Sequence, residues 1–416
     1  MDDYYAILGV SSDATLDEIK KAYRAQLKLY HPDLHGNEDP EVIRVATEMT
    51  RKVDEAYNAL IEEKTGTGGD KPGQPREGGA ADVDRRNSVG MGGSLAGKLA
   101  RLRTKAKNGG KYMIELNADE SIPPKVLKYE GISDITIMLR GVGASRVVSL
   151  SYDGAMFTVE QGVTLILDSN VTLKGRENNK SALIHINKGG TLVMNDGSVI
   201  TGNAAKGNGG GVLVNGTFSM SGGLITGNTA KGHGGGAAVY EGTFSMSGGS
   251  ITGNAAEHVG GGVLVSGTFN MSGGFISGNT AGGSGGGVDV DGTFNMRSGS
   301  ITGNVTKGYG GGVLVSGILN MRGGFISGNT AGLESGGVLV RNGIFIKSGG
   351  TITGYAGDRV NGNAVKNSSG VPRSGKGHAV SAYSSAGFYS RKENTAGPGD
   401  DLFFNSANGE YTGDWD

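Results

Sequence analysis

The sequence predicts two structural classes in one chain: a small all-α domain, then an all-β right-handed parallel β-helix with coils of about 25 residues. Three observations predict this division. Apolar residues near the N-terminus recur every three or four positions, as on one face of a helix. Glycine supplies 80 of the 416 residues, without the three-residue period of collagen. In the second half of the chain the same residues return at a nearly constant interval, as in stacked repeats.

The first long helix is predicted over residues 16–30, where apolar side chains form a single stripe. Thr15 precedes it as an N-cap, and Glu18 stands three residues on, as in a capping box. Pro32 ends the helix, because the residue before a proline is pushed out of the α region. The stripe consists of Leu16, Ile19, Tyr23, Leu27 and Tyr30.

Two further helices are predicted beside it, over residues 4–8 and 41–62. The longer of these also carries apolar residues at helical spacing. Two antiparallel helices joined by a loop bury one small core between their apolar faces. The inward face of the longer helix consists of Val42, Val45, Met49, Val53, Ala56, Tyr57 and Leu60.

Four blocks in this order, "DYYAILGV", "IKKAYR", "YHPD" and "VDEAYNAL", resemble a J-domain of the DnaJ co-chaperone family over residues 1–64. The resemblance implies a domain that binds an ATP-bound DnaK-type 70-kDa heat-shock chaperone and stimulates its ATP hydrolysis. It implies no enzyme activity of this chain itself. It also implies an essential loop of His31, Pro32 and Asp33. The docking face on the preceding helix would consist of Lys20, Lys21, Tyr23 and Arg24.

Elementary physical chemistry agrees with these implied roles. A basic stripe on a helix steers the domain toward an acidic partner surface. The carboxylate of Asp33, held on a loop by a rigid proline, is suited to pair with a guanidinium of the partner.

The next two segments are a predicted flexible linker and a short helix. Residues 65–93 are rich in Gly, Pro, Asp and Arg and lack apolar periodicity. Residues 94–108 are basic and amphipathic, with Leu95, Leu99 and Leu102 on one face. Such a helix suits a membrane surface or RNA. We favour a capping helix over the end of the next domain, because open sheet edges need a cover.

The repeat array has a nearly constant period. Its marker asparagines each follow a glycine and are spaced by 25, 26, 25, 25 and 25 residues. Methionines from Met194 to Met321 and phenylalanines from Phe218 to Phe294 keep the same interval. The marker asparagines are Asn203, Asn228, Asn254, Asn279, Asn304 and Asn329.

Each repeat contains three short apolar pieces separated by Gly, Ser and Asn, which are too short for helices and suit strands. One repeat is therefore one coil, and equivalent residues of successive coils stack about 4.8 Å apart. We predict irregular early coils over 109–200, regular repeats over 201–354, and a terminal coil with a capping tail over 355–416. The array resembles adhesin-like β-helix proteins with a pectin-lyase-like fold.

Catalytic, metal and cofactor sites are not expected in the array. The two aspartates of the regular repeats, Asp289 and Asp291, have no acidic partner one coil away, whereas polysaccharide-cleaving sites need clustered carboxylates. Gly282–Gly292, "GGSGGGVDVDG", faintly resembles a calcium-binding nonapeptide, but its neighbouring coils lack aspartate, so we expect a solvated turn. The histidines share no repeat position, so no metal site is predicted, and no cofactor is implied.

One position varies from repeat to repeat, just before each glycine triplet or its last degenerate copy. Variable side chains on a constant frame are how repeat proteins build binding surfaces, so this strip is a possible binding site for a client protein or a glycan. Relaxed constraint on a turn is the alternative explanation. The strip consists of Asn208, His233, Val259, Ser284, Tyr309 and Glu334.

The net charge and the composition of the chain limit which kinds of partner are expected. The net charge of −1 gives no reason to expect nucleic acid, and the absence of Cys removes disulfides and thiolate zinc sites. We expect no signal peptide and no membrane span, and hence a cytoplasmic location. A J-domain co-chaperone with the β-helix as scaffold, targeting or client-binding module is favoured. The alternative is an adhesin-like or glycan-binding repeat protein with an accessory J-domain.

Overall fold

The computed structural model describes residues 14–15, 19, 23, 53, 57, 60, 93–355, 362–373, 379–384, 387–390, 395–397 and 399–413. The chain divides into two compact units, Met1–Ala81 and Asp82–Asp416, and each is described by itself.

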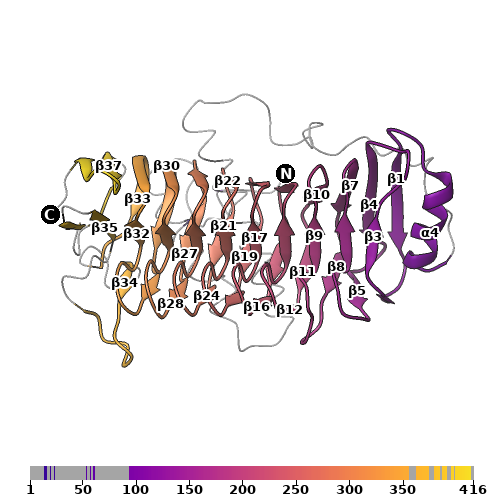
Figure 1. Ribbon diagram of the computed structural model, residues 1–416, viewed down its shortest axis with the longest axis horizontal. Coiled ribbons are helices and arrows are strands. Elements are labelled where there is room, and N and C mark those ends of the chain that lie inside the picture. The colour runs from indigo at the N-terminus through magenta and orange to yellow at the C-terminus, as the bar shows by residue number, and fades with distance from the viewer. Residues whose placement is uncertain are drawn as a thin grey trace. The chain divides into compact units, whose positions relative to one another are not determined.

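The second unit is a parallel β-helix, which confirms the predicted fold class. Its coils stack in one row from α4 (Leu95–Lys105), at the indigo end of Figure 1, toward β37 (Leu402–Asn405), at the yellow end. A regular coil contains the three predicted strands and an additional two-residue strand that the sequence did not predict. One such coil consists of β13 (Val212–Val214), β14 (Thr217–Met220), β15 (Leu224–Thr226) and β16 (Thr229–Ala230).

Equivalent strands of successive coils pair in parallel and form four ladders. The first ladder comprises β1 (Lys111–Leu116), β4 (Ile135–Gly141), β7 (Val163–Leu167), β10 (Thr191–Met194), β14, β18 (Thr243–Met246), β22 (Thr268–Met271), β26 (Thr293–Met296), β30 (Ile318–Ser327) and β33 (Ile344–Ile352). The second comprises β2 (Glu120–Ile122), β5 (Arg146–Leu150), β8 (Val171–Lys174), β11 (Ser198–Thr201), β15, β19 (Ser250–Thr252), β23 (Phe275–Ser277) and β27 (Ser300–Thr302), and it continues into β30 and β33.

The third ladder forms an 11-stranded sheet, and the fourth, made of the short strands, forms a 7-stranded sheet. The third comprises β3 (Lys125–Leu127), β6 (Phe157–Val159), β9 (Ile184–Ile186), β13, β17 (Ala237–Val239), β21 (Val263–Val265), β25 (Val288–Val290), β29 (Val313–Val315), β32 (Val338–Arg341) and β35 (Val380–Ser384). Its last strand, β36 (Gly387–Ser390), pairs antiparallel with β35. The fourth comprises β12 (Ala204–Ala205), β16, β20 (Ala255–Ala256), β24 (Thr280–Ala281), β28 (Val305–Thr306), β31 (Thr330–Ala331) and β34 (Ala364–Val365).

Identical residues stack inside the coils, because every strand pairs in register with its counterpart one repeat later. The rings of Phe218, Phe244, Phe269 and Phe294 are fully buried and lie 4.4, 4.7 and 4.8 Å apart, centroid to centroid. Offset-parallel rings at this spacing add to the stabilisation from apolar burial. The packing explains why the repeats are nearly identical without reference to a ligand.

The marker asparagines form a buried ladder at one corner of the coils. The Nδ2 of Asn254 donates to Oδ1 of Asn279 at 3.0 Å, and the next pairs repeat this bond. The same oxygen also accepts the backbone amide of Asn254, at 3.0 Å. The ladder extends beyond the regular repeats, to Asn179 at one end and Asn363 at the other, across separations of 24 and 34 residues.

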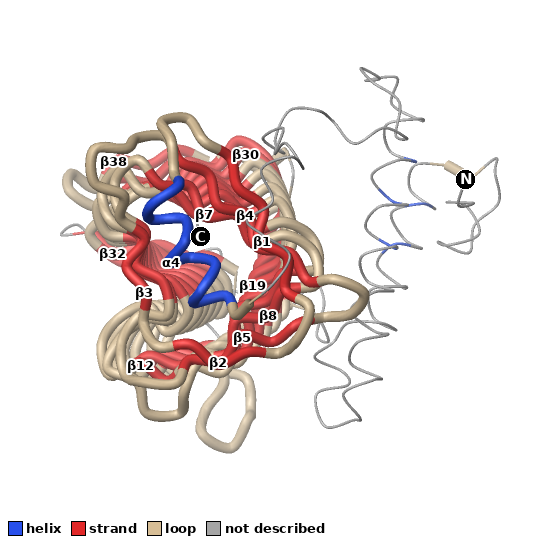
Figure 2. The backbone as a smooth tube through the Cα atoms, turned by 90° about the vertical axis from the view of Figure 1, so that its right-hand side faces the viewer, coloured by secondary structure: helices blue, strands red, loops and turns tan. Residues whose placement is uncertain are grey.

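The helix α4 closes the first end of the β-helix and lies across the opening that β1, β2 and β3 surround (Figure 2). Its Leu95, Leu99 and Leu102 are buried in the same core as the coils. The Nζ of Lys98 donates to the carbonyl of Glu115 in β1 at 2.6 Å. The helix therefore covers the core and also occupies part of the open sheet edge.

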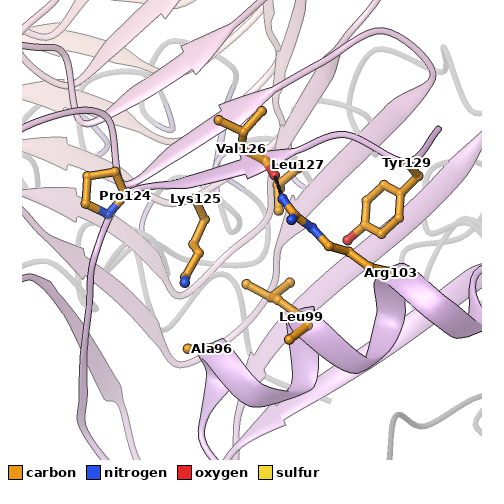
Figure 3. Close-up of a pocket in the computed structure, with 9 residues that line it drawn as sticks. Ala96, Leu99, Arg103, Pro124, Lys125, Val126, Leu127 and Tyr129 are labelled. Carbon is orange, nitrogen blue, oxygen red and sulfur yellow. Dashed lines mark hydrogen bonds between the residues drawn. The ribbon is translucent and has the colours of Figure 1, made fainter.

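A cleft of about 310 Å³ remains between α4 and β3 (Figure 3). At its rim the Nη2 of Arg103 donates to the carbonyl of Val126, in the edge strand, at 3.2 Å. Burial raises the pKa of Tyr129, another lining residue, to about 12, although the nearby Arg103 opposes this. The cleft belongs to the interface between the cap and the first coil.

Antiparallel strands close the other end. The strand β37 pairs with β33, and β38 (Glu410–Thr412) pairs with β37. Lys347 is buried beneath them, and its Nζ donates to the carbonyls of Gly397 and Asp400 at 2.5 and 2.8 Å. In the described parts of the chain, no helix is long and apolar enough to cross a membrane.

In the first unit, most of the described residues form a small core. Ile19, Val53 and Leu60 are buried, and the ring of Tyr23 stacks on that of Tyr57 at 4.0 Å between centroids. The amide of Ile19 donates to the carbonyl of the residue predicted as the N-cap, Thr15, at 3.0 Å. These contacts join described residues of the two predicted apolar faces.

Candidate functional site

The predicted docking loop of the N-terminal unit, His31, Pro32 and Asp33, lies outside the described residues, and so do Lys20, Lys21 and Arg24. Their roles therefore stay predictions. Tyr23 is described, and its half-buried ring packs on Tyr57. A role of Tyr23 in partner docking would therefore depend on this packing, which holds the two helices together.

The variable strip of the β-helix lies in one line. Backbone bridges join Val259 to Ser284, Ser284 to Tyr309, and Tyr309 to Glu334, one per coil. Two members earlier in the chain are joined by a side chain, since Oδ1 of Asn208 accepts the amide of His233 at 2.8 Å. The structure thus aligns these six residues along the β-helix, whereas their role in binding stays a prediction.

The strip borders the outer face of the 11-stranded sheet. In each strand the two flanking residues point into the core and the middle residue points outward. We call these outward residues the floor, and they are Leu213, Ala238, Leu264, Asp289, Leu314, Leu339 and Ser381. On the far side of the floor runs a second row, two residues after each floor position, which consists of Asn215, Tyr240, Ser266, Asp291, Ser316, Arg341 and Tyr383.

Side chains cross the floor at both ends of this face, each from a strip residue to the second row of the next coil. At one end Asn208 is hydrogen-bonded to the hydroxyl of Tyr240. At the other end the guanidinium of Arg341 lies over the ring of Tyr309, 5.6 Å from its centroid. One coil further, the hydroxyl of Tyr383 donates to the carboxylate of Glu334. These contacts hold the strip and the second row together where they occur.

Asp289 lies on this floor, which corrects the expectation of a solvated turn. It is part of β25 and only 3% exposed, and it stands where the adjacent coils carry Leu264 and Leu314. Its Oδ2 has no hydrogen-bond partner in the protein. Burial, and to a lesser extent the nearby Asp291, raise the pKa of Asp289 to about 7.

Two histidines meet at the strip, although their sequence positions differ within the repeat. The rings of His233 and His258 lie 5.3 Å apart. Burial lowers the pKa of His233, and so does His258, whereas Asp291 opposes them. Nowhere in the described part of the chain do three or more His, Asp or Glu side chains converge as metal ligands.

A cleft of about 510 Å³ opens at the C-terminal end of the same face. Leu339 forms its floor, and the aromatic contacts described above form its sides. Burial raises the pKa of Tyr383 well above its usual range, the bond to Glu334 adds to this, and Arg341 opposes it. We call this site the tyrosine cleft, and its main lining residues are Tyr309, Glu334, Leu339, Arg341, Asn342 and Tyr383.

The backbone beside the tyrosine cleft is strained. In the five earlier repeats the residue after the strip is a glycine with positive φ, for example Gly310 at +63°. Ser335 takes this place in the coil of the cleft and keeps a φ of +53°, a conformation that costs a non-glycine residue about 1–2 kcal/mol. Its buried hydroxyl has no partner in the protein. Asn342, which lines the cleft, also has a positive φ, of +66°.

Sequence reasoning identified Tyr309 and Glu334 but missed Arg341, Tyr383 and the buried state of Asp289. A signal for Arg341 existed, because "VLVRNG" breaks the "VLVSG" of earlier repeats by one substitution and one inserted residue. Tyr383 had no such signal, since it follows a long irregular insertion and only the register of β35 against β32 brings it to Glu334.

The comparison with protein families concerns the first unit. The family model described as DnaJ domain matches residues 3–66. Chaperone protein DnaJ 1 of Aquifex aeolicus (strain VF5) is 50% identical over 62 residues, which are 15% of this chain and 15% of that protein. Chaperone protein DnaJ of Geobacillus stearothermophilus is 41% identical over 97 residues, 22% of this chain and 24% of that protein.

A DnaJ homolog subfamily C member 7 homolog of Dictyostelium discoideum is 39% identical over 104 residues, 22% of this chain and 19% of that protein. The chain thus spans about a quarter or less of the length of these three relatives. No solved structure matches it. The motifs and the family match agree on the N-terminal unit, and the chain therefore carries a DnaJ J-domain at residues 3–66, followed by a parallel β-helix.

Proposed function

We propose that this chain is a J-domain co-chaperone, which binds a DnaK-type 70-kDa heat-shock chaperone in its ATP-bound form and stimulates ATP hydrolysis by that partner. The observation that carries the proposal is the match of residues 3–66 to the DnaJ domain, which includes His31, Pro32 and Asp33. The J-domain biases the conformation of its partner and performs no chemistry, so we propose that the chain has no ATPase or other enzyme activity of its own.

The β-helix serves in this proposal as a scaffold, targeting or client-binding module in the cytoplasm. Its core repeats for packing reasons, whereas its outer face carries the side chains that differ from coil to coil. A rigid frame with variable outward residues is suited to hold one partner while the J-domain engages another. Five of the seven floor residues are Leu or Ala, whose side chains offer no hydrogen bonds to the hydroxyl groups of a glycan, so we favour a polypeptide client.

A single-turnover ATPase assay tests the proposal, with the full chain and a purified DnaK-type chaperone. We expect the wild-type chain to accelerate hydrolysis and Asp33→Asn to abolish the acceleration. Asp39→Asn makes the same carboxylate-to-amide change outside the motif and serves as the matched control, which should keep the acceleration. Hydrolysis by the chain alone would contradict the absence of enzyme activity.

A further inference from the structure

The outer face of the 11-stranded sheet collects the unsatisfied polar groups of the β-helix. Among the described residues, four side chains have a buried polar atom without a hydrogen-bond partner in the protein. Two of them, Asp289 and Ser381, are on the floor, and the other two, His233 and Ser335, are in or beside the strip. Buried polar groups are nearly always hydrogen-bonded in folded proteins, so this concentration on one face indicates a surface that receives a ligand.

The tyrosine cleft is the part of this face that has room for a ligand. Its volume of about 510 Å³ lies in the range of clefts that hold small ligands and short peptides. It is also built from departures from the repeat: Arg341 replaces a serine, Asn342 is inserted after it, and Ser335 replaces a glycine. These changes add no packing to the core, and Ser335 adds strain, which proteins tend to store at functional sites.

The charges of the tyrosine cleft favour an anionic group on the ligand. The carboxylate of Glu334 is only 7% exposed and already accepts the hydroxyl of Tyr383. The exposed guanidinium of Arg341 has no carboxylate within 4.0 Å among the described residues. It lies over the ring of Tyr309, and this contact leaves the N–H groups along its edge available to a ligand. A planar fork with five N–H donors matches a carboxylate in two parallel hydrogen bonds.

The other residues that line the tyrosine cleft indicate which chemical group carries the carboxylate. Leu339 is fully buried beneath the cleft, and the rings of Tyr309 and Tyr383 stand beside it. An apolar side chain next to a carboxylate would pack on these half-buried rings while its acid reaches the guanidinium. This combination occurs at the C-terminal residue of a polypeptide, where one α-carbon carries both groups.

We propose that the tyrosine cleft binds the free C-terminal carboxylate of an extended polypeptide whose last side chain is apolar, with Arg341 as the carboxylate receptor. The inference rests on the proposed co-chaperone function only in naming the polypeptide as a client; the binding itself is independent of the J-domain. It gives the β-helix a specific task, which is to hold an exposed chain end.

Isothermal titration of the full chain tests this site, with N-acetyl-Gly-Gly-Leu as the probe and the same peptide with a C-terminal amide as its control. We expect the free acid to bind and the amide to lose about 10- to 100-fold in affinity, because a charge-assisted hydrogen-bond pair contributes a few kcal/mol. Arg341→Gln should cause a similar loss with the free acid. Arg322→Gln, which changes an exposed arginine of β30 one coil away, should leave binding unchanged.

Several outcomes would overturn the inference: equal affinity for acid and amide, no binding of either peptide, or full binding by Arg341→Gln. Binding of a uronic-acid oligosaccharide in place of the peptide would also overturn it. The ATPase assay separates this inference from the co-chaperone proposal. Arg341→Gln should still stimulate the partner chaperone, and Asp33→Asn should still bind the peptide, so a failure of either proposal is visible by itself.

Discussion

The Nδ2 of Asn279 donates a hydrogen bond of 3.0 Å to the Oδ1 of Asn304, the equivalent residue one coil further along the β-helix. The Oδ1 of Asn279 in turn accepts both the amide and the side chain of Asn254, each at 3.0 Å. Both outer residues are fully or almost fully buried, so every donor and acceptor of the ladder depends on its neighbours.

Replacing Asn279 with alanine should therefore destabilise the β-helix by about 3 kcal/mol. The buried backbone amide of Asn254 loses its partner, and the carbonyl of Ile251 and the Oδ1 of Asn304 each lose a donor. Chemical denaturation followed by circular dichroism measures this loss. Asn295→Ala is the matched control, since Asn295 is hydrogen-bonded to Asn270 and Asn320 in a second asparagine row that is only half-buried. If both variants lose equal stability, the buried ladder has no special role.

Relief of the strain beside the tyrosine cleft should stabilise the fold. Ser335→Gly restores the residue that other coils use at this positive φ and removes a buried hydroxyl without a partner, so we expect a gain of about 1 kcal/mol. Ser266→Gly, at an exposed position of the second row, should instead lower the free energy of unfolding by a few tenths of a kcal/mol. A loss of stability in Ser335→Gly would show that the serine has an unrecognised favourable contact.

Asp289 should make the stability of the β-helix depend on pH. Its pKa is about 7 in the fold against an ordinary value of 3.8, so between these values the native state keeps a proton that the unfolded state has lost. The free energy of unfolding should therefore fall as pH rises from about 4 to about 7 and level off above.

Asp289→Leu, which copies the adjacent coils, should remove this dependence and stabilise the protein by about 2–3 kcal/mol more at pH 8 than at pH 5. Melting temperatures at the two pH values measure the difference. Asp291→Asn changes an exposed aspartate two residues away and should show a much smaller difference. Equal gains at both pH values would mean that Asp289 is not neutral in the fold.

Tyr23 should act in the J-domain through its packing. Tyr23→Phe keeps the ring that stacks on Tyr57, so stability and stimulation of the partner should both persist. Tyr23→Ala removes the ring and should increase amide hydrogen exchange in the N-terminal unit together with a loss of stimulation. Loss of stimulation by Tyr23→Ala without faster exchange would instead assign Tyr23 a direct contact with the partner.

How much the sequence predicts depends on how regular the packing is. The interval from Asn203 to Asn329 predicts the coils and the ladder, because in-register stacking places identical residues on one another. The spacing does not predict the ladder members Asn179 and Asn363, because an early irregular coil and a long insertion separate them from the regular repeats. A two-residue strand such as Ala204–Ala205 is too short for any periodicity to indicate.

The outer face could be predicted only in part. The repeat places its variable residues in one line, and the structure confirms the line from Val259 to Glu334. The burial of Asp289 could not be predicted, because it depends on how the glycine turns and the neighbouring leucines cover the sheet. The bond between Glu334 and Tyr383 joins residues 49 positions apart across an irregular insertion, which no local pattern indicates.

The most direct test of the co-chaperone account is the rate of single-turnover ATP hydrolysis by a DnaK-type chaperone in the presence of the full chain. The account predicts that the wild-type chain and Asp39→Asn accelerate hydrolysis, whereas Asp33→Asn does not. If the wild-type chain, folded and in excess over the chaperone, leaves the rate unchanged, or if Asp33→Asn accelerates it equally, the account is contradicted.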